Sequence, residues 1–152
     1  MLLLKTRHSE DFDPLSSPLD RSRSPYAESY DDYPARCQNL AALVGYDSFL
    51  WCYPAERQIP FYEGVKLVEW VIEVSDERIL GSVDDARWVQ YVKGGDRLPR
   101  SVFSKSRPPS EERSILVAYP LKREELVSKT VFEFISPTEA NVVSVDDFRA
   151  SL

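Results

Sequence analysis

Histidine and cysteine, which often act as catalytic bases, nucleophiles and metal ligands, are rare in this chain. Among its 152 residues are one histidine, His8, and two cysteines, Cys37 and Cys52. Nucleophilic sites of the Ser-His or Cys-His kind need a rigidly held imidazole, and His8 lies in a segment without apolar periodicity. We therefore expect His8 to be solvated. Two cysteines and one remote histidine do not make a four-ligand zinc site, and we interpret the cysteines as buried thiols.

Carboxylates offer a second route to chemistry. Three pairs are brought together by local structure: Glu69 with Glu73, Asp84 with Asp85, and Asp146 with Asp147. Acid pairs can carry out glycoside hydrolysis or metal-dependent reactions. Nothing else in the sequence completes such a site, and no glycine-rich phosphate loop occurs. We interpret the acids as solvated faces, turns and caps, and predict no catalytic residue, metal ligand or cofactor.

The most unusual local pattern is a basic segment at residues 97–107. Four cations occur there without an acid, and an aromatic residue lies among them: Arg97, Arg100, Phe103, Lys105 and Arg107. Basic side chains interleaved with aromatics are typical of a nucleic-acid groove, and they also suit an acidic protein partner. An ordinary polar loop is the interpretation that the pattern favours most. Because the chain carries a net charge of -6, we favour a protein partner over a nucleic acid.

The first 35 residues differ in composition from the rest. They contain four prolines, six serines and seven acids against four bases, and apolar periodicity ends after Leu4. Such a segment buries too little surface to offset the entropy of ordering it. We predict an extended, disordered arm over residues 1–35 and a globular domain over residues 36–152. The expected partner-binding anchors of the arm are Leu2, Leu3, Leu4, Tyr26, Tyr30 and Tyr33.

The remaining chain reads mostly as strands. One short helix is expected after Asp31 or Asp32, with Pro34 in its first turn and Gly45 at its end. Apolar, β-branched runs predict strands at residues 48–53, 65–74, 79–83, 87–93, 113–119 and 130–135. In the strand at 65–74, Trp70 and Ile72 are expected in the core. Helical turns are expected at residues 121–128 and from Ser144 through residue 148.

These elements predict a β-rich α+β domain built on one small antiparallel sheet of about six strands, resembling a barrel or a sandwich. Antiparallel pairing is favoured because the connections are short.

The chain is expected to be cytoplasmic or intracellular, with a virion or large complex among the settings, because no signal peptide or membrane span is visible. The favoured function is a non-enzymatic adaptor or accessory component of a larger assembly, binding a protein partner or another copy of itself through the arm. The alternatives are a regulator or inhibitor acting through residues 97–107 and, third, a carboxylate-dependent enzyme.

Overall fold

The computed structural model describes residues 1–10, 12–16, 32–46, 48–57, 66–106, 113–136 and 139–146. Its helices and strands follow one another as β1 (Leu2–His8), α1 (Tyr33–Val44), β2 (Phe49–Pro54), β3 (Lys66–Val74), β4 (Ile79–Asp84), α2 (Asp85–Val92), β5 (Phe103–Ser104), β6 (Arg113–Ala118), β7 (Leu126–Ser136) and β8 (Glu139–Asp146). Short 3-10 turns lie at Asp76–Arg78, Arg100–Val102 and Arg123–Glu125.

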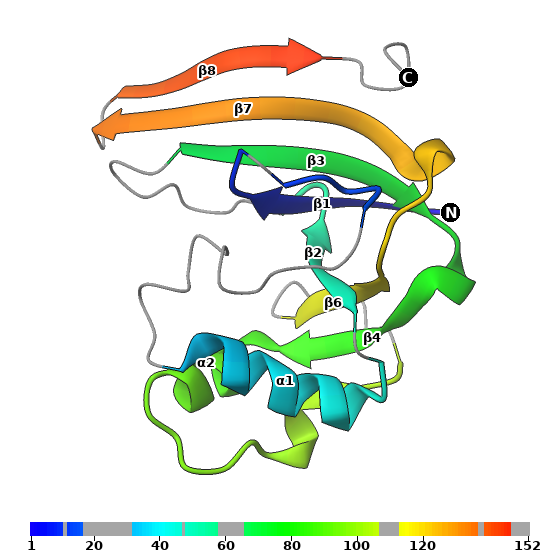
Figure 1. The fold of residues 1–152 in the computed structure, drawn as a ribbon, viewed down its shortest axis with the longest axis vertical. Coiled ribbons are helices and arrows are strands. Elements are labelled where there is room, and N and C mark those ends of the chain that lie inside the picture. The colour runs from blue at the N-terminus through cyan, green and yellow to red at the C-terminus, as the bar shows by residue number, and fades with distance from the viewer. Residues whose placement is uncertain are drawn as a thin grey trace.

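Within the described ranges the strands form one antiparallel sheet in the order β5-β4-β6-β2-β1-β3-β7-β8. The predicted β-rich fold with a single antiparallel sheet and short helices is confirmed. The sheet is open, with β5 and β8 at its two ends, so it is not a closed barrel. Figure 1 shows β8, β7, β3 and β1 stacked in one half of the molecule, while α1 and α2 lie at the opposite end beside β4.

The first strand lies in the middle of this sheet. β1 pairs with β3 along its whole length, from Leu2 opposite Val74 to His8 opposite Val68, and with β2 at two positions. The side chain of Leu4 is completely buried. The prediction of an extended, disordered arm is therefore wrong for residues 2–8, because their backbone pairs with β3 throughout and with β2 at Leu4 and Lys5. It is also wrong for residues 12–16, where Phe12 and Leu15 pack against buried side chains, and for residues 33–35, which begin α1. It stays a prediction for residues 11 and 17–31, which lie outside the described residues.

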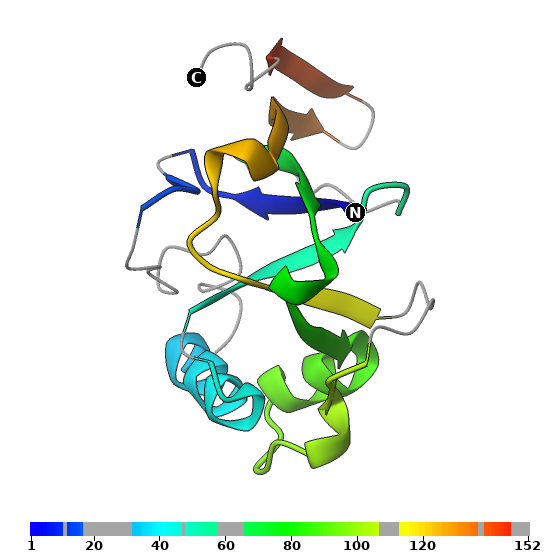
Figure 2. The same cartoon turned by 90° about the vertical axis from the view of Figure 1, so that its right-hand side faces the viewer.

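The core consists of two clusters on opposite faces of the sheet. The first joins β1, β2, β3 and β6, and Phe12 and Leu15 pack against it. The second lies between the sheet and the two helices. Strand β6 supplies Ile115 to the first cluster and Leu116 to the second, so this part of the sheet is buried on both faces. Burial on both faces explains the continuous apolar runs of β2 and β6. Figure 2 shows the helices on one side of this part of the sheet.

Most of the predicted elements are present. Helix α1 contains Pro34 in its first turn and ends at Gly45, whose φ of 79° lies in the left-handed region that glycine favours. Asp32 precedes the helix, but its side chain makes no capping hydrogen bond. Strands β2, β3, β4, β6 and β7 match the predicted strands, and Trp70 and Ile72 are buried as predicted. Both cysteines are buried, and they do not form a disulfide bond.

Two local predictions are wrong, and a third is confirmed only in part. The segment predicted as a strand at 87–93 belongs to helix α2, where the Asp84 carboxylate accepts a hydrogen bond of 3.1 Å from the Arg87 N–H. Trp88, Tyr91 and Val92 are buried at the i, i+3 and i+4 spacing of one helix face. The helical turns expected at residues 121–128 are confirmed as one 3-10 turn at Arg123–Glu125, whereas β7 already begins at Leu126. Ser144 does not cap a helix, because residues 139–146 pair with β7 as β8.

The position of β1 predicts unequal effects of substituting two neighbouring leucines. Leu4→Ala should lower the free energy of unfolding by about 2–5 kcal/mol, because it leaves a cavity in the first core cluster. Leu3 is on the other face of the same strand and is 45% exposed. Leu3→Ala should therefore change stability much less, by about 0.5 kcal/mol. Equilibrium denaturation in urea measures both values, and equal small effects would show that β1 is not an integral strand.

Candidate functional site

Of the four expected arm anchors that the structure describes, Leu4 and Tyr33 are buried. Leu4 is buried in the first core cluster and Leu2 is partly buried against it, whereas Leu3 remains partly exposed. Tyr33 begins α1, is buried in the second cluster and meets the Trp88 ring edge-on at a centroid distance of 6.5 Å. Leu4 and Tyr33 are therefore unavailable as partner anchors, which corrects the prediction. Tyr26 and Tyr30 lie outside the described residues.

His8 is held in place by its neighbours. Its Nε2 lies 2.7 Å from the hydroxyl oxygen of buried Thr6, and its ring stacks on Phe12 with centroids 3.7 Å apart. Thr6 uses its one hydroxyl proton to bond the Trp51 carbonyl at 2.9 Å, so the His8 Nε2–H must donate to the Thr6 oxygen. The expectation of a solvated His8 is therefore wrong. Its ring closes one end of the first core cluster.

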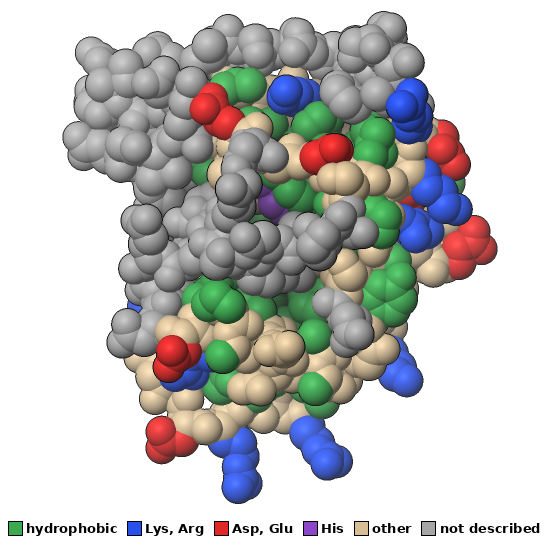
Figure 3. Space-filling model, viewed as in Figure 1, with side chains coloured by type: hydrophobic (Ala, Val, Ile, Leu, Met, Phe, Trp, Pro, Cys, Tyr) green, Lys and Arg blue, Asp and Glu red, His purple; other side chains and the backbone are tan. Residues whose placement is uncertain are grey.

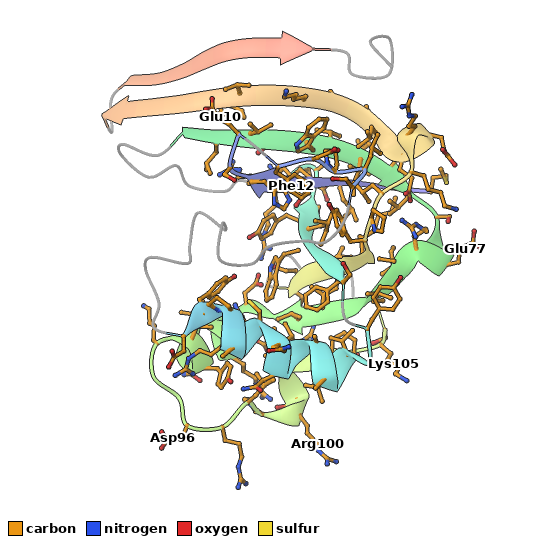
Figure 4. The ribbon with its side chains drawn as sticks, in the orientation of Figure 1. Glu10, Phe12, Glu77, Asp96, Arg100 and Lys105 are labelled. Carbon is orange, nitrogen blue, oxygen red and sulfur yellow. The ribbon has the colours of Figure 1, made fainter. Side chains whose placement is uncertain are left out.

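The basic segment lies at the helical end of the molecule. Arg97, Arg100 and Lys105 are exposed, and Figure 4 shows Arg100 and Lys105 pointing away from the body of the protein. Arg87 and Lys93, both from the helix α2 region, add two exposed cations. Lys and Arg side chains project from this end in Figure 3. These five cations, namely Arg87, Lys93, Arg97, Arg100 and Lys105, are called the basic surface below. Arg107 lies outside the described residues.

The apolar residues of the same segment face inward. Val102 is completely buried, and Leu98 and Phe103 pack against the second core cluster. The Phe103 ring lies directly over Gly81, where a Cβ atom would be only 2.6 Å from two ring carbons. Only glycine leaves room for this ring. Phe103 therefore anchors the segment to the sheet, and the prediction that it contacts a partner is not supported by its position.

Arg36 holds the adjoining loop from the other side. Its guanidinium donates to the carbonyls of Tyr91, at 2.6 Å, and Gly95, at 3.0 Å, and lies 4.7 Å from the centre of the Tyr91 ring. A cation at the carboxyl end of a helix complements the partial negative charge of the last carbonyls. Helix α1 therefore fixes the end of α2 and the start of the basic segment.

The two acids at the start of α2 are engaged by surrounding groups. Asp84 caps the helix and lies 3.8 Å from the guanidiniums of both Arg87 and Arg113. Asp85 lies 2.7 Å from the Arg57 guanidinium and accepts a hydrogen bond from the Ser114 hydroxyl. Burial raises the pKa of Asp85 above its ordinary value of 3.8, although Ser114 and Arg57 act in the opposite direction. These contacts position α2 at the end of β4.

A second group of charges lies on the middle strands. The Arg7 Nε donates to a carboxylate oxygen of Glu69 at 2.8 Å, and both side chains are largely buried. Lys5 is on the same face of β1 and donates to the Arg57 carbonyl. Buried charges are costly to desolvate and gather at functional sites more often than elsewhere. No sequence pattern indicated this group, because its members come from separate segments.

Comparison with known proteins does not assign the chain to a family. No protein-family model, no curated protein and no solved structure matches it. Across the described part of the chain, no group of three or more His, Cys, Asp or Glu side chains is placed to hold a metal ion. None of the helices in the described ranges is long and apolar enough to cross a membrane.

The raised pKa of Asp85 predicts a specific pH dependence. A group whose folded pKa lies above its unfolded value stabilises the fold below the unfolded pKa, and this contribution is lost as the pH rises through the folded value. The free energy of unfolding of the intact protein minus that of Asp85→Asn should therefore decrease from pH 3.8 upward. Urea denaturation of both proteins from about pH 3 to about pH 7 measures this difference in free energy. The exposed Asp96→Asn is the control, and a difference for Asp85→Asn that grows with pH would contradict the prediction.

Proposed function

We propose that this protein is a non-enzymatic binding module that uses the basic surface to bind an acidic surface of a partner protein. The observation that carries the proposal is the fixed geometry of residues 97–105. Val102 and Phe103 hold the segment against the core, whereas Arg97, Arg100 and Lys105 are exposed. Cations on a fixed backbone lose less entropy on binding than cations on a mobile loop.

The distribution of charge supports the same role. The whole chain has a net charge of -6, yet five exposed cations gather at one end with Asp96 among them. A positive patch on a negative protein orients the approach of an acidic partner and disfavours binding through the other faces. Regulation or inhibition of that partner is the favoured setting. An accessory role within a larger assembly uses the same contact.

An acidic protein is a better fit than a nucleic acid. Single-stranded nucleic acids bind through aromatic rings on which bases stack, in addition to cations. The aromatic rings near the basic surface, those of Trp88, Tyr91 and Phe103, all pack into the second core cluster. A few cations without stacking rings give only modest affinity for phosphates at physiological salt.

The adaptor function through the arm now has less support. Of its expected anchors, Leu4 and Tyr33 are core residues. The carboxylate enzyme is likewise less supported, since Asp84 and Asp85 cap and pair around α2 and Glu69 pairs with Arg7. The basic surface is therefore a better-supported binding site than either the arm or the carboxylates.

A matched pair of charge reversals tests the proposal. Arg97→Glu combined with Arg100→Glu should weaken capture of the native partner at least about tenfold, a loss of about 1.4 kcal/mol. The control combines Lys122→Glu with Arg123→Glu, which makes the same change in net charge at two exposed residues outside the basic surface. Quantitative pull-down from the native source, with thermal unfolding of each variant, gives both readings.

The outcomes separate the interpretations. Both variants should unfold near the temperature of the intact protein, because the four side chains are exposed. Capture that survives nuclease treatment and is lost only in the Arg97 and Arg100 variant supports an acidic protein partner. Capture abolished by nuclease would indicate a nucleic acid instead. Equal capture by both variants and the intact protein would refute a binding role for this surface.

A further inference from the structure

Strand β1 brings two cations into the interior of the sheet. Lys5 is only 9% exposed and Arg7 only 7%. Successive side chains of a strand alternate between its faces, so both lie on the face opposite Leu4 and Thr6. Removing an ammonium from water costs several kcal/mol unless new partners compensate. A buried lysine in a central strand therefore requires an explanation beyond folding.

Arg57 adds a third cation on this face. It follows β2, and its guanidinium carbon lies 5.5 Å from the centre of the Tyr53 ring. Tyr53 is directly opposite Lys5 in the register of β1 and β2. The Lys5 ammonium donates to the backbone carbonyl of Arg57 itself. The ammonium and the Arg57 residue are therefore neighbours, held together by the sheet.

The described cations of this face differ in how they are paired. Glu69 pairs with Arg7, and Asp85 pairs with Arg57. Burial lowers the pKa of Lys5, and the charges of Arg7 and Arg57 act in the same direction, against Glu69 and Glu56. No carboxylate in the described ranges is paired directly with the Lys5 ammonium.

Hydrogen-bonding capacity is also in excess. An ammonium has three N–H donors, and a guanidinium has five. Among the residues that the structure describes, Lys5 has one acceptor, the Arg57 carbonyl, and the Arg57 guanidinium has one, the Asp85 carboxylate. The side chains of Arg57 and Asp85 are 17% and 31% exposed, so this face remains accessible from the solvent at Arg57.

We propose that Lys5 and Arg57 form a binding site for a small oxyanion, the phosphate or carboxylate group of a soluble ligand. A guanidinium can present two parallel N–H donors to such a group, and an ammonium adds a point charge. The Arg7–Glu69 pair fixes the neighbouring position of the strand. The site shares no residue with the basic surface, and the proposal does not depend on the function proposed above.

Inorganic phosphate and acetate are suitable probes, since they carry the two oxyanion groups without the rest of a ligand. Calorimetric titration of each into the full chain, at matched ionic strength in chloride, measures the affinity directly. The thermal midpoint in phosphate against chloride provides a second reading, because a ligand that binds only the folded state raises it. Phosphate binding with weak acetate binding assigns the site to phosphate groups, and the reverse to carboxylates.

Lys5→Met is the test variant, because methionine retains much of the apolar stem and removes the charge. Its dissociation constant for the bound anion should be at least about tenfold higher than that of the intact protein. Lys122→Met removes an exposed lysine that lies outside both proposed sites, and it should bind the anion as the intact protein does. Arg57→Lys keeps the positive charge but loses the paired donors, and it should also bind more weakly.

Three results would overturn the proposal. The first is that the intact protein shows no saturable binding of either anion. The second is that Lys5→Met and Arg57→Lys bind the anion as well as the intact protein does. The third is that Lys122→Met alone loses binding. If Lys5→Met does not fold, Arg57→Lys decides the question, because it preserves a cation beside Asp85. Failure here leaves the partner contact of Arg97 and Arg100 unaffected, so the two proposals are tested separately.

Discussion

The insertion of β1 between β2 and β3 is the constraint on which the rest of the structure depends. β1 is the strand that joins the β5-β4-β6-β2 half of the sheet to the β3-β7-β8 half. Its pairing with β3 is long, while its pairing with β2 covers only Leu4 and Lys5. Closing the long loop between β1 and β3 costs entropy, which the burial of Leu4 and the continuous ladder help to offset.

The two-sided burial of β2 and β6 in turn positions the helical end. One face of these strands carries the first core cluster and the other supports α1 and α2. Arg36 then ties α1 to the end of α2, and Phe103 packs on Gly81. The backbone that carries the outward cations of the basic surface is consequently held in place by contacts on the inner side of the same segment.

Strand β1 has one face that suits a buried position and one face that does not. One face bears Leu4 and Thr6, which suit a core, whereas the other bears Lys5 and Arg7, which do not. Glu69 and the Arg57 carbonyl compensate part of the cost of burying these cations. Residues that break the rules of a stable core are often kept for function, and Lys5 is such a residue, because its ammonium is bonded to a backbone carbonyl in a central strand.

By itself the sequence determined the elements whose signals are local. Local patterns were enough to predict two kinds of feature. They are the apolar, β-branched runs of β2, β3, β4 and β6, and the boundaries of α1 at Pro34 and Gly45. Tertiary structure alone decided β1, because its polar half is stable only where Arg7 meets Glu69, 62 residues away, and Lys5 meets Arg57, 52 residues away. Tertiary structure also decided α2. A run of eight residues is compatible with both the helical and the strand period, and the packing of Trp88 and Tyr91 in the second core cluster selects the helix. The inward orientation of Phe103 was likewise decided by tertiary structure. Phe103 packs on Gly81, a residue of another segment, and the sequence pattern of residues 97–107 does not show this contact.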